Sequence, residues 1–419
     1  MPYPDANSRS AQLFKRARNV LPDGGSRSTI RLTPYSIYLE SASGKSITDV
    51  DGVTRMDFNN NYSSLIHGHA QPQVVAAAQA QAARGSAFSF GSEAEIALAE
   101  LLVARVPSFE RIRFMNSGTE AVMNAVKAGR AFTGRPKIAK CEYAYHGSYD
   151  PVEASLSAGP GDHATPRAYS RGTPEGVLSD VVIIPFNDVE VAREMLTANA
   201  AELAAIVFDP FGLGFGSVAP TQAFIDMLAA VRDEHGVMLV ADEVVAFRSD
   251  YEGCLSRFGV SADYTALGKI IGGGFPVGAV AGAADRMAVF EVADGVAPLP
   301  HGGTFNANPV TMAAGHAAMS LMTRDAFDHI NGLGEAFRKG LSEALAEVNV
   351  AGEIRGQASV FSINVDDGAT TGELSGLRLY LLNHGYFLGS GSLGCVSTAM
   401  DSADVDPFCQ TVLDGLRSL

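Results

Sequence analysis

The feature that most constrains the fold is a series of short apolar runs in the middle of the chain. They read RIRFMN, KIAKCE, VVIIPF, AAIVFD, VMLVAD, YTALGK and VGAVAG. The middle runs are rich in Val, Ile and Ala and lack polar alternation, which is typical of strands buried on both faces of a parallel sheet. Amphipathic stretches such as TQAFIDMLAAVRDEHG lie between runs and would supply the helical crossovers. We therefore expect an α/β fold with a mainly parallel central sheet flanked by helices.

The two ends of the chain show a different pattern. The first segment has helical spacing over Ser10–Leu21, followed by three short β-rich runs separated by Ser-Gly and Asp-Gly turns, which predicts an antiparallel meander. The last part contains a long helical region and then an α+β segment. We expect a large domain over residues 61–307, and a smaller α+β domain formed by the terminal segments 1–60 and 308–419.

Charge and composition argue against several kinds of partner. Lys and Arg total 31 against 46 Asp and Glu, a net charge of −15, so a broad nucleic-acid or anionic-membrane surface is not expected. The sequence contains no run of about 20 apolar residues, the length needed to span a membrane. The N-terminal sequence also lacks the apolar stretch of a secretory signal. The four cysteines have neither CxxC spacing nor the density of a disulfide framework. We expect a cytoplasmic protein without a bound metal.

The first motif with chemical content follows the run RIRFMN. Ser117, Gly118 and Thr119 lie between this predicted strand and a helical pattern. Backbone N–H groups at the positive start of a helix can hold a phosphate. Ser and Thr are also ordinary N-cap residues, so both interpretations stay open on the residues alone.

Three more candidate residues stand at or just after the ends of apolar runs. Tyr145 could stack on a flat cofactor, although a core or rim aromatic is the alternative. Asp242 ends VMLVAD, where a buried acid needs a cationic or hydrogen-bonding partner such as a protonated heterocyclic nitrogen; a solvated loop acid is the alternative. Desolvation of Lys269 would make its neutral amine a nucleophile toward aldehydes, unless it is a surface lysine. With the phosphate site, these are the parts that pyridoxal phosphate (PLP) needs.

Six motifs, in order, closely resemble the class III (subgroup II) aminotransferases of PLP fold type I. They are NSGTEA, YHG, ADEV, TALGK, GGGFPVGA and GTFNANPVTMAAG, and the resemblance covers nearly the whole chain. It leans toward the glutamate-1-semialdehyde aminomutase-like branch and the related β-amino acid aminotransferases. It implies ping-pong transfer of an amino group from an amino acid, β-amino acids included, or an amine to an oxo acid. Intramolecular transfer of the glutamate-1-semialdehyde 2,1-aminomutase type is the alternative, because both reactions use the same catalytic core.

The resemblance also implies roles for individual residues. Lys269 matches the lysine that forms the Schiff base with the cofactor, and Asp242 matches the acid that keeps the pyridine nitrogen protonated. Tyr145 matches the residue that stacks on one face of the ring, and Val244 matches the apolar residue on the other face. His146 belongs to the same YHG motif and is expected among the cofactor-binding residues.

Further implied contacts concern the phosphate group and the partner subunit. Ser117, Gly118 and Thr119 resemble the phosphate-binding residues of the family. Thr304 matches a threonine that reaches the phosphate from the neighbouring subunit, which implies a homodimer with shared active sites. Asp209 stands where the family usually has Glu, so this cofactor-binding acid is shorter by one methylene and its contact is expected to be looser.

The substrate side is marked by a single basic residue. Gly25-Ser26-Arg27-Ser28 lies where β-amino acid aminotransferases carry a similar Ser-Arg-Ser, whose arginine binds a substrate carboxylate. A guanidinium suits that bidentate contact, while an exposed loop arginine is the alternative. The stretch GYFLGSGSLGCVSTAM has no second arginine, and it lacks the acid that aminomutases carry there. These residues favour an aminotransferase with a partly apolar amino donor.

Overall fold

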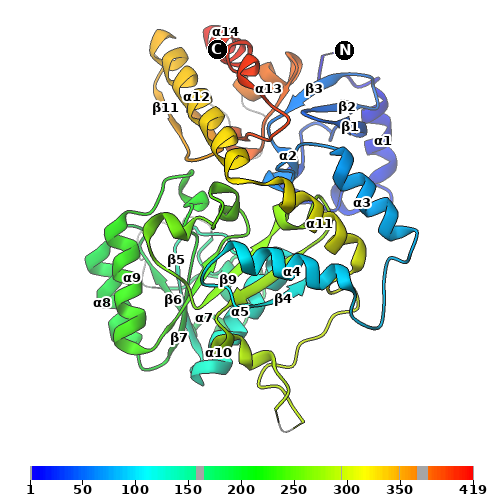
Figure 1. Ribbon diagram of the computed structural model, residues 1–419. Helices are drawn as coiled ribbons and strands as arrows, with labels where there is room; N and C mark the ends of the chain where they lie inside the picture. Colours follow the sequence, from blue (N-terminus) through cyan, green and yellow to red (C-terminus); the bar gives the residue numbers. More distant parts are fainter. Residues whose placement is uncertain (1, 157–164, 294, 349, 366–375, 419) are drawn as a thin grey trace. The chain divides into compact units, whose positions relative to one another are not determined.

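All seven apolar runs form strands of one sheet in the computed structural model, which describes residues 2–156, 165–293, 295–348, 350–365 and 376–418 (Figure 1). The strand order is β4-β10-β9-β8-β7-β5-β6. Their bounds are β4 (Arg111–Met115), β5 (Lys137–Cys141), β6 (Val181–Ile184), β7 (Leu203–Phe208), β8 (Met238–Asp242), β9 (Tyr264–Gly268) and β10 (Gly278–Gly282). Strands β5 to β9 pair in parallel, whereas β10 is antiparallel to both β9 and β4. The expected mainly parallel α/β sheet is confirmed.

Helices cover both faces of this sheet. Alternate side chains of the strands pack on one face against α5 (Gly118–Thr133), and on the other against α8 (Val189–Asn199) and α9 (Gln222–His235), which lie side by side in Figure 1. Because β5, β7, β8 and β9 run parallel, their carboxyl ends meet at one edge of the sheet. Ligand sites of open α/β sheets form at that edge.

The sheet belongs to a compact unit of residues 73–327. Helices α4 (Glu93–Arg105) and α11 (Pro309–Leu321) pack against each other in this unit. Among the remaining α-helices of this unit, α3 (Pro72–Ala82) is the longest, and the others are single turns: α6 (Asp150–Glu153), α7 (Glu175–Leu178) and α10 (Ala284–Met287).

A second unit contains residues 1–72 and 328–419. The expected meander is present as β1 (Leu39–Ser43), β2 (Ser46–Asp49) and β3 (Thr54–Asp57), and β13 (Tyr386–Phe387) extends it in parallel to β3. An antiparallel sheet follows, with β11 (Gly352–Arg355), β12 (Val360–Val365) and β14 (Leu393–Cys395). The helices are α1 (Arg9–Ala17), α2 (Asn60–Ser63), α12 (Arg324–Val348), α13 (Gly376–Asn383) and α14 (Val405–Ser418). Among the described helices, none has the length and apolar character needed to cross a membrane.

The sequence predicted boundaries after residues 60 and 307, and the two units divide at 72 and 327. The later second boundary reflects α11, which follows residue 308 but packs against α4 of the sheet-bearing unit. A helix that buries its apolar face on a domain stays with that domain, whatever the composition of its sequence.

All four cysteines have free thiols. Cys141, Cys254 and Cys395 are buried, and Cys409 on α14 is half-buried. Burial raises the pKa of the Cys141 and Cys409 thiols to about 12, and it raises the pKa of Cys254 as well.

Candidate active site

Lys269 and Asp242 lie at the carboxyl ends of neighbouring parallel strands. Asp242 pairs in register with Ala266, two residues before the end of β9, and the N–H of Glu243 donates to the carbonyl of Ala266 at 2.9 Å. Lys269 directly follows β9 and has a φ of 48°, in the left-handed region that residues other than glycine rarely occupy. Strained backbone of this kind collects at functional sites.

The carboxylate of Asp242 is buried and held at both oxygens. Its Oδ1 accepts the N–H of Val244 at 3.1 Å, and its Oδ2 lies 2.8 Å from Nδ1 of the buried His146. The other ring nitrogen of His146, Nε2, is buried and has no hydrogen-bond partner among the described residues. The structure thus places His146 in direct contact with the acid that the sequence singled out.

The start of α5 provides donors suited to an anion. Ser117 is the N-cap, and its hydroxyl accepts the N–H of Glu120 at 3.1 Å, while the hydroxyl of Thr119 accepts the N–H of Ser148 at 3.2 Å. Each hydroxyl keeps its own hydrogen for donation. The N–H groups of Gly118 and Thr119 lie in the first turn, where a helix has no carbonyl to accept them. The N-cap interpretation is therefore correct and remains compatible with a phosphate site.

Close contacts bring the separate motifs together. A Cβ atom on Gly118 would lie 2.7 Å from a methyl carbon of Val244, and one on Gly268 would lie 3.2 Å from the same carbon. A Cβ atom on Gly147 would lie 2.7 Å from the backbone of Thr119. The NSG, YHG, DEV and LGK motifs therefore meet at one place, and at Gly118 and Gly147 only glycine leaves room for the close approach.

Tyr145 lies two residues before Gly147 and is 57% exposed. Its hydroxyl is 3.5 Å from the hydroxyl of Ser148, and Val244 packs partly buried against the core beneath the sheet edge. A large aromatic side chain with this exposure has a free surface for a planar ligand.

Asp209 follows β7 and bonds within its own loop. Its Oδ1 accepts the N–H of Phe211 and its Oδ2 accepts the N–H of Leu213, both at 2.8 Å. Desolvation, and then the negative charge of Asp242, raise the pKa of Asp209 to about 6. The contacts of the shortened acid in this structure are thus with the loop after β7.

Glu243 is a second buried acid that the sequence interpretation did not single out. Its two carboxylate oxygens accept the N–H groups of Cys254 at 2.7 Å and Leu255 at 2.9 Å. Burial raises its pKa to about 7 despite these two donors. The sequence could have indicated this buried acid, because Asp242 and Glu243 directly follow the apolar run VMLVA. If the end of β8 is buried, the two carboxylates cannot both be solvated.

Thr304 lies on the exposed loop before α11. It lines a cavity of about 220 Å³ together with Phe88, Phe90 and neighbouring residues. Asn306 on the same loop accepts a hydrogen bond from the side chain of Asn116 at 2.7 Å, which links this loop to the segment before α5.

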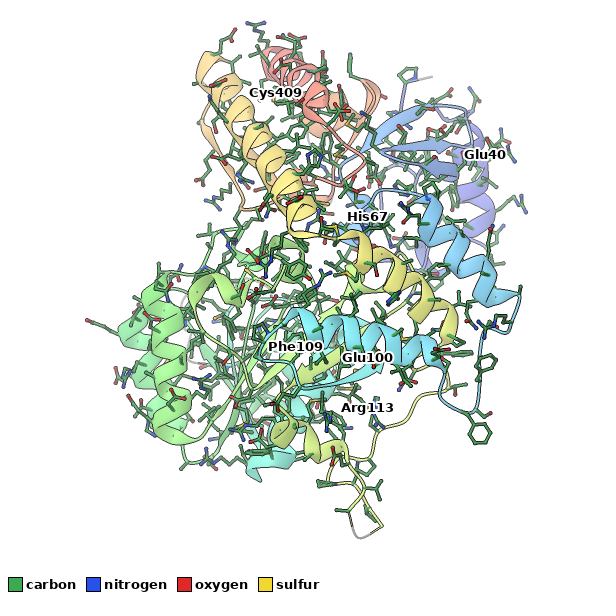
Figure 2. All side chains as sticks on the ribbon, viewed as in Figure 1. Glu40, His67, Glu100, Phe109, Arg113 and Cys409 are labelled. Carbon is green, nitrogen blue, oxygen red and sulfur yellow. The ribbon has the colours of Figure 1, made fainter. Side chains whose placement is uncertain are left out.

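Arg27 and the segment His67-Gly68-His69 lie in the unit of residues 1–72 and 328–419. Arg27 is exposed, and its Nη1 donates to Oδ1 of Asn61 at 3.0 Å. The histidines of His67-Gly68-His69 have protein partners, because His67 (Figure 2) lies 2.9 Å from the hydroxyl of Thr398, and His69 lies 2.7 Å from a carboxylate oxygen of Asp57. Within the described ranges, no group of three or more His, Cys, Asp or Glu side chains could hold a metal ion.

These residues fit pyridoxal phosphate. The fixed carboxylate of Asp242 suits a protonated pyridine nitrogen, the start of α5 suits the phosphate, and Lys269 provides an amine at the end of the adjacent strand. Fold and site together define a PLP enzyme of fold type I. The chain belongs to the aminotransferase class-III family, whose sequence model matches residues 30–391.

Comparisons with known proteins agree with this assignment. The chain is 34% identical over 426 residues to a glutamate-1-semialdehyde 2,1-aminomutase of Methanothermobacter thermautotrophicus, covering 98% of this chain and 100% of the relative. Its structure is similar to that of an omega-transaminase from Sphaerobacter thermophilus, with a TM-score of 0.95, 44% identity and coverage of 99% and 98%. It also resembles a transaminase with bound PLP, with a TM-score of 0.93, 40% identity and coverage of 98% and 97%.

Proposed function

We propose that the protein is an aminotransferase that moves an amino group from an amino acid, β-amino acids included, or an amine to an oxo acid. One observation carries the proposal: Lys269, in a left-handed conformation, stands beside the strand that ends in the buried carboxylate of Asp242. Family membership and the likeness to an omega-transaminase support it.

Bound PLP supplies an electron sink that acidifies the hydrogen on the carbon carrying the substrate amine. In the proposed mechanism Lys269 anchors the cofactor, and its Nζ then accepts that proton as the general base. His146 and the N–H of Val244 hold the Asp242 carboxylate in the orientation needed at the pyridine nitrogen. The hydroxyls of Ser117 and Thr119 would donate to the phosphate of bound PLP.

The proposed contacts with the pyridine ring come from two motifs. Tyr145 is assigned to one face and Val244 to the other, because Tyr145 has an exposed ring and Val244 touches Gly118 at the start of α5. Apolar or aromatic contact on both faces fixes the plane of the ring and excludes water from it.

Borohydride trapping tests the choice of lysine. The wild type should be labelled at Lys269, and Lys269→Ala should lose both label and turnover while still binding PLP noncovalently. The matched control is Lys140, a buried lysine on β5 that donates to the carbonyl of Ala154 at 2.8 Å and whose pKa is lowered to about 8 by burial. Lys140→Met should keep the label. A label on Lys140, or one that survives in Lys269→Ala, would reject the assignment.

A substrate panel tests the reaction itself. Amines, α-amino acids and β-amino acids are each combined with pyruvate or 2-oxoglutarate, and formation of the new amino acid is measured. The proposal expects transfer that requires both a donor and an oxo acid, as a ping-pong mechanism does. Failure of every pair would count against the aminotransferase.

The aminomutase reaction is the second candidate, because a curated relative covering 98% of the chain bears that name. The assay is conversion of glutamate 1-semialdehyde without an added oxo acid, since the amino group then moves within one molecule. We expect little conversion, because Gly389–Gly394 offers small uncharged residues and no acid. Rapid conversion would reverse the order of the two candidates.

We also propose a homodimer with shared active sites. Its support is an exposed apolar patch around the loop of Thr304, where Phe90 is 89% exposed, Phe305 60% and Phe88 48%. Large exposed aromatic side chains grouped in this way are typical of protein interfaces. The cytoplasmic location expected from the N-terminal sequence stays a prediction, to be checked by fractionation of cells that produce the protein.

A further inference from the structure

The segment labelled α2 (Asn60–Ser63), which follows the meander in the unit of residues 1–72 and 328–419, is a short left-handed turn and has no ordinary right-handed helical backbone. Asn60, Asn61, Tyr62 and Ser63 have φ values of 46°, 49°, 55° and 65°. In this region the Cβ atom of an L-residue approaches a backbone oxygen, so single residues visit it and consecutive ones are uncommon. Asn tolerates the conformation better than most residues, whereas Tyr does not. Strain of this kind persists only where its surroundings fix it.

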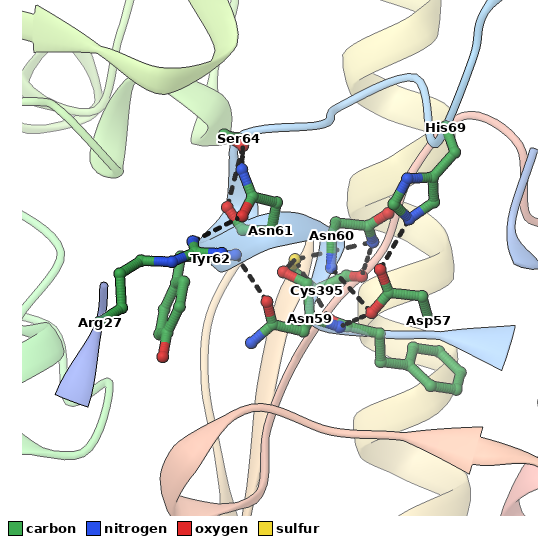
Figure 3. Close-up of polar contacts among 10 residues, drawn as sticks. Arg27, Asp57, Asn59, Asn60, Asn61, Tyr62, Ser64, His69 and Cys395 are labelled. Atoms are coloured by element: carbon green, nitrogen blue, oxygen red, sulfur yellow. Dashed lines mark hydrogen bonds and ion pairs between the residues drawn. The ribbon is translucent and has the colours of Figure 1, made fainter. Parts of the chain in front are cut away.

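Hydrogen bonds to neighbouring segments fix the turn (Figure 3). One carboxylate oxygen of Asp57 accepts the N–H groups of Asn59 at 2.8 Å and Asn60 at 3.1 Å, and Oδ1 of Asn59 accepts the N–H of Tyr62 at 2.7 Å. The amide of the fully buried Asn60 donates to the carbonyl of Cys395 at 2.9 Å. The turn is therefore a rigid platform that extends from the end of β3.

This platform presents the side chain of Asn61 to Arg27. Oδ1 of Asn61 accepts from Nη1 of Arg27 at 3.0 Å, and Nδ2 of Asn61 donates to the hydroxyl of Ser64 at 3.1 Å. That hydroxyl gives its own hydrogen to the carbonyl of Asn61 at 2.9 Å, so it can only accept from the amide. The amide is thereby oriented with its oxygen toward the guanidinium.

The neighbouring arginine has a different partner. Arg31 forms an ion pair with Asp23 at 2.8 Å, so its charge is compensated within the chain. Arg27 makes no ion pair with Asp or Glu in the part of the chain that the structure describes, and its partner Asn61 is neutral. A neutral acceptor orients a guanidinium without competing for its charge, and four of its five N–H groups stay available.

We propose that Asn61 is a positioning residue that holds Arg27 ready for the carboxylate of the amino donor. The inference rests on the proposed aminotransferase function and on the role that the family resemblance implies for Arg27, namely contact with a substrate carboxylate. Asn61 occupies one guanidinium nitrogen and restricts the side chain, which lowers the ordering cost when a carboxylate binds. It acts on the binding of carboxylated donors and leaves the chemical step untouched.

The main test is Asn61→Gly in the holoenzyme, since glycine keeps the left-handed conformation and removes the acceptor. The KM for carboxylated donors should rise about three- to tenfold with little change in kcat, and the KM for amines without a carboxylate should stay the same. Asn61→Asp should raise the KM of carboxylated donors further, because its charge competes for Arg27, and added salt should reduce that effect. Equal losses for both donor classes would overturn the proposal.

Two more variants separate the possible failures. Arg27→Ala should weaken carboxylated donors by about 30- to 1000-fold in kcat/KM, while sparing simple amines. Asn61→Gly should then have no further effect in the Arg27→Ala background. If Arg27→Ala lowers kcat/KM equally for both donor classes, the substrate role of Arg27 is wrong. If Arg27→Ala affects only carboxylated donors and Asn61→Gly leaves their KM unchanged, only the positioning role of Asn61 is wrong.

The matched control is Tyr38→Phe. The hydroxyl of Tyr38 donates to the carbonyl of Gly24 at 3.1 Å, three residues before Arg27, so the variant loosens the same loop without touching the guanidinium. It should leave the KM of both donor classes unchanged. A rise equal to that of Asn61→Gly would assign the effect to loop anchoring and overturn the proposal.

Discussion

At the scale of single residues, Asp242 provides the clearest test of the site. Asp242→Asn keeps the size of the side chain but removes the negative charge. Its amide oxygen can still accept the N–H of Val244, and its NH₂ group then faces Nδ1 of His146. We expect the cofactor to remain bound and kcat to fall by about 10²- to 10⁴-fold, because an unprotonated pyridine withdraws electrons poorly. Absorbance of the bound cofactor and steady-state turnover measure the two effects. Near-normal turnover would remove Asp242 from its role.

Glu243 gives a prediction about pH and stability. Its pKa is about 7 in the folded protein and 4.5 ordinarily, so between these values the folded protein holds a proton that the unfolded chain releases. The free energy of unfolding should therefore fall as pH rises from about 4.5 to about 7, by up to about 3 kcal/mol from this group. Glu243→Gln should remove this contribution and make the slope shallower, while Asp209, whose pKa is raised to about 6, still contributes to it. It should also cost about 1–3 kcal/mol, because its NH₂ group faces a backbone N–H.

Denaturant unfolding at several pH values between 5 and 8 measures this difference. The comparison is between the slopes of wild type and variant, so other titrating groups cancel. Parallel pH dependences in the two proteins would show that Glu243 does not titrate in this range.

At the scale of elements, two glycines of α12 form a matched pair. A Cβ atom on Gly332 would have no neighbour within 4 Å, whereas one on Gly334 would lie 2.2 Å from the carbonyl oxygen of Ala358. Gly332→Ala should stabilise the protein by about 0.5–1 kcal/mol through helix propensity. Gly334→Ala should destabilise it by about 1–3 kcal/mol, because the backbone near Ala358 must shift. Thermal unfolding measures the change in stability of each variant. Changes of the same sign in the two variants would contradict the prediction.

The strands were predictable because each buried strand is an uninterrupted apolar run. The direction of β10 was not predicted, since VGAVAG is as apolar as the parallel strands. The short link from Gly268 to Gly278 indicates the antiparallel direction of β10, because a parallel pair requires a longer crossover connection. The long helical region predicted in the last part of the chain is present as two helices, α11 and α12, which are separated at Met322, whose backbone is not helical.

Part of the candidate site could be predicted from the sequence for a similar reason. Lys269, Asp242 and Ser117 stand next to strand or helix ends, so their positions follow from the order of the elements. The contact between His146 and Asp242 was not predictable, because it joins the loop after β5 to the end of β8, 96 residues further along the chain. The left-handed turn was hidden as well, since Asn60 and Asn61 read as an ordinary turn signal and give no sign that Tyr62 follows them into that conformation.

At the scale of the whole molecule, the shared-site dimer predicts complementation. Lys269→Ala and Thr304→Asp chains should each be inactive as homodimers, the second because a carboxylate repels the phosphate. A heterodimer purified through two different tags should have one intact site and about half the activity of the wild-type dimer. Inactive heterodimers, or a fully active monomer in sedimentation and activity measurements, would contradict the shared site.

The shielded thiols described above make the molecule suited to labelling. With the pKa values of Cys141 and Cys409 near 12 and that of Cys254 also raised, few of these groups are thiolates at neutral pH, and Cys395 is buried. Cys409 (Figure 2) is the one with some exposure, and Cys409→Ser would remove it. A single cysteine introduced at the exposed Val20 would then be the main target of a maleimide dye, so fluorescence could follow the N-terminal segment during turnover.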